Sequence, residues 1–209
     1  MTAVMTLARE ERGDFADFLA DLTPQQWDSR TLCGNWRVHD VAAHVISYDP
    51  LSTRQLIGRM ARGLVTKGGA NAIGVAEFSV LPPDELVALF RRHAQPRGLT
   101  TGFGGRIALT DGMIHQQDIR RPLGLPRQIP AERLRVTLDF ARWAPPIRGA
   151  LRARGVRMVA TDLDWSAGRG PAVTGPGEAL LMVMAGRCDA MADLGGPGLP
   201  RLEARLRRG

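Results

Sequence analysis

Hydrophobic residues recur at helical spacing along most of residues 4–154. Leu7, Phe15, Phe18 and Leu22 share one face, with charged residues between them, which predicts a helix over residues 4–22. The same periodicity, bounded by proline, glycine or capping residues, predicts further helices. These cover residues 38–48, 51–64, 82–93, 107–120 and 131–154, the last disturbed at Pro145-Pro146. Residues 65–80 contain several glycines and show no clear pattern.

The pattern changes after Gly155. Residues 158–161 and 171–174 are short, β-prone segments between turn residues, and a last helix is predicted over residues 178–194. We therefore expect a mainly α protein. Residues 1–154 would form a helical bundle, and residues 155–209 a short α+β extension packed on that bundle.

Composition is ordinary for a globular protein, with 44% hydrophobic residues, but the charge is not balanced. The formal net charge is +7, and Lys67 is the only lysine. Abundant Arg, Ala, Gly and Pro are typical of a GC-rich coding genome, so we interpret much of the basic charge as a solvated surface. Binding of an anionic small molecule remains an alternative. No helix-turn-helix or zinc-finger spacing supports nucleic-acid binding.

The cellular location of the protein and the redox state of its cysteines are predicted from features that the sequence does not show. Cys33 and Cys188 lie far apart, which indicates no disulfide framework. Residues 1–22 contain several charges and so do not resemble a signal peptide. The apolar run over residues 179–185 is too short to span a bilayer. We expect a cytoplasmic protein without membrane contact.

Candidate chemistry appears first in the helix over residues 107–120. Asp111 and His115 are four residues apart, so on a helix their side chains share one face. An imidazole nitrogen and a carboxylate oxygen are suitable ligands for a divalent metal. Asp118 lies on the same stripe and could orient the His115 ring, although a helix cap or an ion pair with Arg121 is an alternative.

His44 lies in the apolar helix over residues 38–48. A lone histidine in such a helix is more often a core residue than a ligand. Asp40 precedes it by four residues and could accept a hydrogen bond from the free ring nitrogen. His39 falls on another face of the helix, and His93 lies in a polar stretch.

Three segments together resemble the mycothiol-dependent maleylpyruvate isomerase family, a group of DinB-like metal-binding four-helix bundles. Residues 34–45, GNWRVHDVAAHV, resemble the family motif GW-x-V-x-D-V-x-x-H-L. Residues 111–124, DGMIHQQDIRRPLG, resemble the motif E-x-x-x-H-x-x-D-x-x-R-x-x-G. Residues 164–198 are similar to the C-terminal region of many members. The resemblance therefore implies a DinB-like four-helix bundle with a small C-terminal α+β extension.

The resemblance also implies a ligand set. The metal ligands of the family fall on His44, Asp111 and His115, which leaves coordination positions open. Aspartate at 111 departs from the usual glutamate, and the Gly-Trp pair of the motif is separated here by Asn35. Zinc is the favoured ion, with nickel, manganese and iron as alternatives.

An external thiol activated by the metal is the chemistry that the resemblance implies. The protein would be a transferase or isomerase that uses mycothiol, a low-molecular-weight thiol, on small electrophiles, in keeping with an actinobacterial source. Arg120, Arg121 and Arg187 are candidates for binding the cofactor. A DinB-like hydrolase that uses metal-bound water and a non-catalytic metal-binding module are the alternatives, and a homodimer is a further option.

Overall fold

The computed structural model describes residues 3–207 and divides the chain into two compact units, Met1–Pro126 and Arg127–Gly209. We call them unit 1 and unit 2 and describe each by itself. The division comes earlier than the boundary at residue 154 that we expected. The helix after Pro130 packs against the helix that starts at Gly177, so it belongs to the C-terminal unit.

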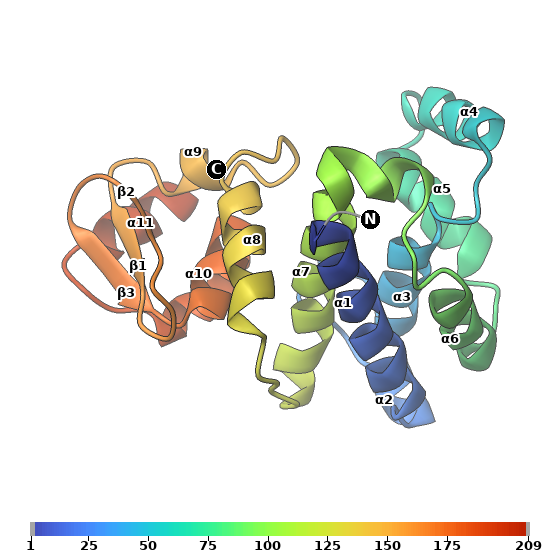
Figure 1. Cartoon of the computed structure of the whole chain (residues 1–209), viewed down its shortest axis with the longest axis horizontal. Coiled ribbons are helices and arrows are strands. Elements are labelled where there is room, and N and C mark those ends of the chain that lie inside the picture. Colours follow the sequence, from blue (N-terminus) through green and yellow to red (C-terminus); the bar gives the residue numbers. More distant parts are fainter. Residues whose placement is uncertain (1–2, 208–209) are drawn as a thin grey trace. The chain divides into compact units, whose positions relative to one another are not determined.

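Unit 1 is built from helices joined by short loops (Figure 1). They are α1 (Ala3–Ala20), α2 (Pro24–Trp27), α3 (Val38–Ile46), α4 (Thr53–Gly63), α5 (Gly69–Phe78), α6 (Pro83–Arg92), the 3-10 segment η1 (Gly98–Gly105) and α7 (Arg106–Leu123). Four of them, α1, α3, α6 and α7, pack against one another as a bundle. Helix α5 packs on α3, and α4 packs on α5.

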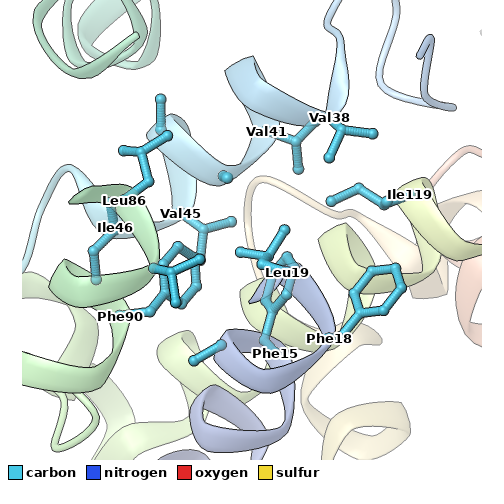
Figure 2. Close-up of a cluster of buried hydrophobic side chains, with 14 of the residues drawn as sticks. Phe15, Phe18, Leu19, Val38, Val41, Val45, Ile46, Leu86, Phe90 and Ile119 are labelled. Carbon is cyan, nitrogen blue, oxygen red and sulfur yellow. The ribbon is translucent and has the colours of Figure 1, made fainter. Parts of the chain in front are cut away.

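The bundle core is the set of apolar faces that the hydrophobic periodicity predicted. Phe15 of α1 and Phe90 of α6 meet edge to face, with ring centroids 5.1 Å apart. Figure 2 shows the side chains of α1, α3, α6 and α7 converging on this cluster. Burial of such side chains is the main stabilising contribution to a bundle of this kind. Its labelled members are Phe15, Phe18, Leu19, Val38, Val41, Val45, Ile46, Leu86, Phe90 and Ile119.

Two differences from the predicted elements have simple causes. Helix α5 lies in residues 65–80, for which we predicted no helix. It starts where Gly68 and Gly69 adopt left-handed backbone angles. The helix predicted to reach residue 154 ends at Ala141 instead. Two consecutive prolines follow closely, and proline cannot continue a helix.

Unit 2 combines helices with a three-stranded sheet in the order β2-β1-β3. β1 pairs antiparallel with β2 and parallel with β3. We predicted the segments of β1 and β3 as β-prone, but not β2. The last predicted helix ends at Met184 rather than 194, since Gly186 has a positive φ of 88°. The elements are α8 (Ala131–Ala141), α9 (Gly149–Arg152), β1 (Arg157–Ala160), β2 (Ser166–Gly168), β3 (Ala172–Gly175), α10 (Gly177–Met184), η2 (Cys188–Asp193) and α11 (Leu199–Leu206).

The mainly α class with a smaller α+β part at the C-terminal end is therefore confirmed. Helix α10 is buried along its length and packs on both α8 and β1. Among residues 3–207, no helix is both long enough and apolar enough to cross a membrane.

Candidate metal centre

Helix α7 carries two of the three predicted ligands on one face. Asp111 and His115 lie one turn apart, and Nε2 of His115 is 3.5 Å from Oδ1 of Asp111. Helix α7 ends at its C-cap, Gly124, which is in the left-handed conformation, shortly after Pro122. The turn that holds Asp111 and His115 lies well before this end and is regular. The spacing prediction for this pair agrees with the geometry.

Helix α3 brings His44 to the same place. This ring is 5% exposed, and its Nε2 lies 3.8 Å from Oδ1 of Asp111. The rings of His44 and His115 are perpendicular, with centroids 4.9 Å apart. Donor atoms of His44, Asp111 and His115 all lie within 4.8 Å of one another. The three predicted ligands, from two helices distant in sequence, therefore form one cluster.

The spacing of these donors suits a small divalent ion. Tetrahedral zinc with bonds of about 2.0–2.2 Å keeps its ligand atoms about 3.3–3.6 Å apart. The measured separations from Oδ1 of Asp111, 3.5 Å and 3.8 Å, need only small side-chain adjustments to reach that range. Nδ1 of His44 is buried and has no hydrogen-bond partner among the described residues. The residues therefore fit a metal, and the half-exposed Asp111 leaves one side of the cluster accessible.

The second ring nitrogen of His115 is hydrogen-bonded to a carboxylate. Nδ1 of His115 donates to Oδ2 of Asp118 over 2.9 Å, and the Asp118 side chain is fully buried. This arrangement leaves Nε2 directed at Asp111, as in many carboxylate–histidine–metal sites. The predicted orienting role of Asp118 therefore has a direct geometric basis.

A loop that we did not include in the site also reaches His115. Its backbone is fastened to α7, because the amide of Leu32 donates to the carbonyl of Asp118 over 3.0 Å. The thiol of the next residue, Cys33, hydrogen-bonds with His115. Cys33, His115 and Asp118 thus form a second group of close donor atoms that shares His115 with the first. No periodic pattern in the sequence indicated this contact.

Electrostatics favour a charged pair when no metal is bound. Burial alone would lower the pKa of His115, but the Asp111 carboxylate and the hydrogen bonds to Asp118 and Cys33 outweigh it and raise the pKa to about 10. Burial would raise the pKa of Asp111, but the charge of His115 and the nearby His44 side chain lower it to about 2. A metal must therefore displace a proton from His115.

The predicted role of Asp40 is not what the structure shows. Its Oδ2 accepts a hydrogen bond from the backbone amide of Arg37 over 2.9 Å and lies 3.7 Å from Nε of that residue. Asp40 is the third residue of α3, so its carboxylate caps the free amides of the helix start instead of reaching His44. His39 is also occupied elsewhere, with Nε2 2.9 Å from the carbonyl of Leu81.

Aromatic residues surround His44. The Trp36 ring centroid is 5.0 Å from that of His44, and the Tyr48 ring is perpendicular to it at 6.3 Å. The Tyr48 hydroxyl donates to Oδ1 of Asn71 over 2.6 Å, which fastens α5 to the site. Tyr48 follows His44 by four residues, a helical spacing that the sequence analysis could have used.

Helix α4 is tied to the same region by one arginine. The Arg59 guanidinium lies 5.3 Å from the centre of the Tyr48 ring, donates to the Ser47 carbonyl over 2.9 Å and pairs with Glu77 at 2.6 Å. Arg59 is the buried residue of an otherwise peripheral helix. Residues 65–80, which showed no pattern in the sequence, thus help to hold Tyr48 beside His44 through Asn71 and Glu77.

The three arginines predicted to bind a cofactor have different surroundings. The Arg120 guanidinium lies 3.7 Å from the centre of the Phe18 ring, and Nη1 donates to the Leu125 carbonyl, so this residue serves packing. Arg121 is partly exposed in the last turn of α7. Arg187 belongs to unit 2, where Nη1 donates to the Ala185 carbonyl. For all three arginines, cofactor binding remains a prediction.

Solved structures with a similar fold support the bundle assignment. The fold matches crystal structures of the mycothiol-dependent maleylpyruvate isomerase and of a histidine-to-alanine mutant of it, each with a TM-score of 0.62. Sequence identity is 18% and 17%, and each match covers 93% of this chain and 91% of the other. At this identity the likeness concerns the fold, and it confirms the expected DinB-like bundle.

Sequence comparison addresses the N-terminal part of the chain. No curated protein matches the sequence. The profile of the mycothiol maleylpyruvate isomerase N-terminal domain matches residues 8–98, a segment that includes His44 and ends before Asp111. The resemblance to this family is therefore confirmed by a match over residues 8–98, the part of the chain that contains the first of the three motifs.

Proposed function

We propose that unit 1 binds one divalent metal ion, with zinc favoured, and that the protein is a thiol-dependent transferase or isomerase for small electrophiles. The observation that carries this proposal is the convergence of donor atoms from His44, Asp111 and His115 within 4.8 Å. Three protein ligands leave room for an exogenous ligand, as in catalytic rather than structural zinc sites.

A divalent ion in this position would supply Lewis acidity that lowers the pKa of a coordinated thiol. The protein residues would then have separate tasks. His44 and His115 offer neutral nitrogen donors, and Asp111 offers the negative charge. Asp118 accepts a hydrogen bond from Nδ1–H of His115, which fixes the proton on Nδ1 and keeps Nε2 free for the ion.

The identity of the thiol rests on the relatives. The matched family and both similar structures carry mycothiol in their names, so mycothiol is the thiol that we propose. Trp36 and Tyr48 place aromatic surface next to His44, which suits the apolar part of a small electrophile.

Metal content is the first test. Elemental analysis of the purified full-length protein should find about one equivalent of a divalent metal, and His115→Ala should abolish it. His39→Ala is the matched control, because His39 lies on the same helix as His44 but bonds to Leu81. Equal metal content in all three proteins would contradict the proposed ligands.

Thiol dependence is the second test. With mycothiol and monochlorobimane, a reagent that fluoresces when a thiolate displaces its chloride, the metal-loaded protein should accelerate conjugate formation. The His44→Ala variant should lose this acceleration, and the His39→Ala variant should keep it. Hydrolysis of ester or amide substrates without any added thiol would instead favour a DinB-like hydrolase that uses metal-bound water.

A further inference from the structure

Unit 2 contains a cavity of about 580 Å³ beside α9 and α11, two helices that contact each other. In Figure 1 these helices have the orange and red colours of the C-terminal part. Each side contributes two arginines four residues apart, and leucines supply apolar surface. The arginines are Arg148, Arg152, Arg201 and Arg205, and the leucines are Leu151 and Leu206.

Two of the four guanidinium groups are fixed by backbone carbonyls. Arg152 donates through Nη1 to the carbonyls of Ile147 and Met184, and Arg205 donates through Nε to the carbonyl of Leu151. These bonds hold the side chains in place and leave other N–H groups of each guanidinium available, since arginine has five donors. The cavity wall is therefore preorganised.

The other two guanidinium groups have no such partner. Within residues 3–207, the guanidinium groups of Arg148 and Arg201 form no ion pair and donate no hydrogen bond to the protein. Arg148 also has a φ of 55°, a left-handed conformation that is costly for a residue other than glycine. Both side chains are exposed, so their guanidinium groups are open to a ligand in the cavity.

Charge around the cavity is of one sign. None of the described residues that line it is acidic, and unit 2 as a whole carries +6 of the formal net charge of +7. Burial lowers the pKa of Arg152, and the nearby charges of Arg187 and Arg148 lower it further. Like charges at a spacing of four residues also disfavour a helix. An anion in the cavity would relieve this repulsion.

We propose that this cavity binds a small molecule with two or more anionic oxygen groups, carboxylate or phosphate. The guanidinium fork matches both groups, and bidentate contacts with them are strong. The volume lies in the range of small-molecule pockets. Leu151 and Leu206 would contact the apolar part of such a ligand. The site consists of unit 2 residues alone and does not depend on the metal centre.

Calorimetric titration of the full-length protein tests this, with pyrophosphate as the phosphate probe and citrate as the carboxylate probe. We expect at least one probe to bind, and the tighter one identifies the acid group. The double variant R148Q/R201Q should bind that probe about tenfold more weakly or worse. The control R135Q/R157Q removes the same net charge from exposed positions outside the cavity and should change binding less than twofold.

Three outcomes would overturn the proposal. The first is that neither probe binds at low salt. The second is that both double variants weaken binding equally, which indicates a general charge effect. The third is that a single-stranded oligonucleotide binds and neither probe competes with it, which indicates a nucleic-acid surface. Circular dichroism of both double variants shows whether they remain folded. Replacing these exposed arginines leaves the buried residues of unit 2 unchanged, so we expect normal spectra.

Discussion

Units 1 and 2 carry the same number of cationic side chains, 14 each of the 28 Lys and Arg residues, but unit 1 has 13 acidic residues and unit 2 has eight. In unit 1 several arginines are paired inside the fold. Arg12 lies 2.6 Å from Asp49, and both side chains are buried. In unit 2, Arg152 and Arg205 donate to backbone carbonyls instead.

This difference shows where the basic charge of the chain comes from. The two units differ in length, since unit 1 spans residues 1–126 and unit 2 only residues 127–209. Acidic residues are about equally frequent in both, so the net charge differs because unit 2 carries the same number of cations on a shorter chain. We infer that unit 1 uses balanced charge to build a metal centre, whereas unit 2 presents an excess of cations to an anionic ligand.

The largest effect that would sharpen this contrast is the loss of a metal ligand. His115→Ala removes one of three donors, so the affinity for Zn²⁺ should fall by more than the 10–100-fold typical of losing an outer partner. The double variant R135Q/R157Q in unit 2 should keep its Zn²⁺ affinity. Competition with a chromophoric chelator measures both. Similar losses in the two proteins would mean that the metal centre is not confined to unit 1.

Dependence on pH should separate the two units next. The pKa of His115 is raised to about 10 in the metal-free protein, so a proton must leave before the ring can bind an ion. Below that pKa, Zn²⁺ affinity should rise about tenfold per pH unit, roughly 100-fold between pH 6.5 and 8.5. Citrate binding by unit 2 should change little over this range, because arginine stays protonated. A flat Zn²⁺ profile would exclude His115 as a ligand.

Two hydrogen bonds of equal length, one buried in unit 1 and one partly buried in unit 2, offer a finer comparison. Asp118 accepts from His115 in unit 1, and Asp139 accepts from Nε1 of Trp165 in unit 2, both over 2.9 Å. Asp118→Asn should weaken Zn²⁺ binding about 10–100-fold. Asp139→Asn should lower the free energy of unfolding by about 1 kcal/mol and leave Zn²⁺ binding unchanged. If the two variants affect Zn²⁺ equally, Asp118 has only a structural role.

The smallest expected effect is on the free energy of unfolding when a buried arginine, rather than an exposed one, is replaced. Arg59 of unit 1 is buried, so Arg59→Met should lower the free energy of unfolding by about 1–3 kcal/mol. Its ion pair adds little to this, since Glu77 is 38% exposed. The exposed Arg135 of unit 2 is the control, and Arg135→Met should stay within about 0.5 kcal/mol of wild type. Denaturant unfolding followed by circular dichroism compares them, and equal values would contradict different uses of arginine.

Regular amphipathic helices were the part of the fold that the sequence predicted well. Asp111 and His115 could be paired from spacing alone, because both lie on one helix. His44 could not be added from periodicity, since its contact with α7 is tertiary, and it came from the family motif. Cys33 was missed because its loop has no period, and the contact that brings it to α7 is tertiary, a backbone hydrogen bond from Leu32 to Asp118.

The domain boundary and the polar partner of His44 were the weak points of the sequence analysis. Spacing placed Asp40 near His44, but free amides at the start of α3 compete for the same carboxylate, and they lie closer. The helix after Pro130 has the same periodicity as the bundle helices, so pattern alone did not reveal that its apolar face packs on α10. Tertiary competition, rather than local propensity, explains both.

The distance in sequence between His44 and Asp111 has a consequence for folding. An ion shared by these residues would act as a cross-link that encloses α4, α5, α6 and η1 within one closed loop of the chain. Because the unfolded chain holds no such preformed site, the binding energy of the ion would add to the stability of that whole loop. Metal supply would then set how long unit 1 survives a protease, while unit 2 would be indifferent to it.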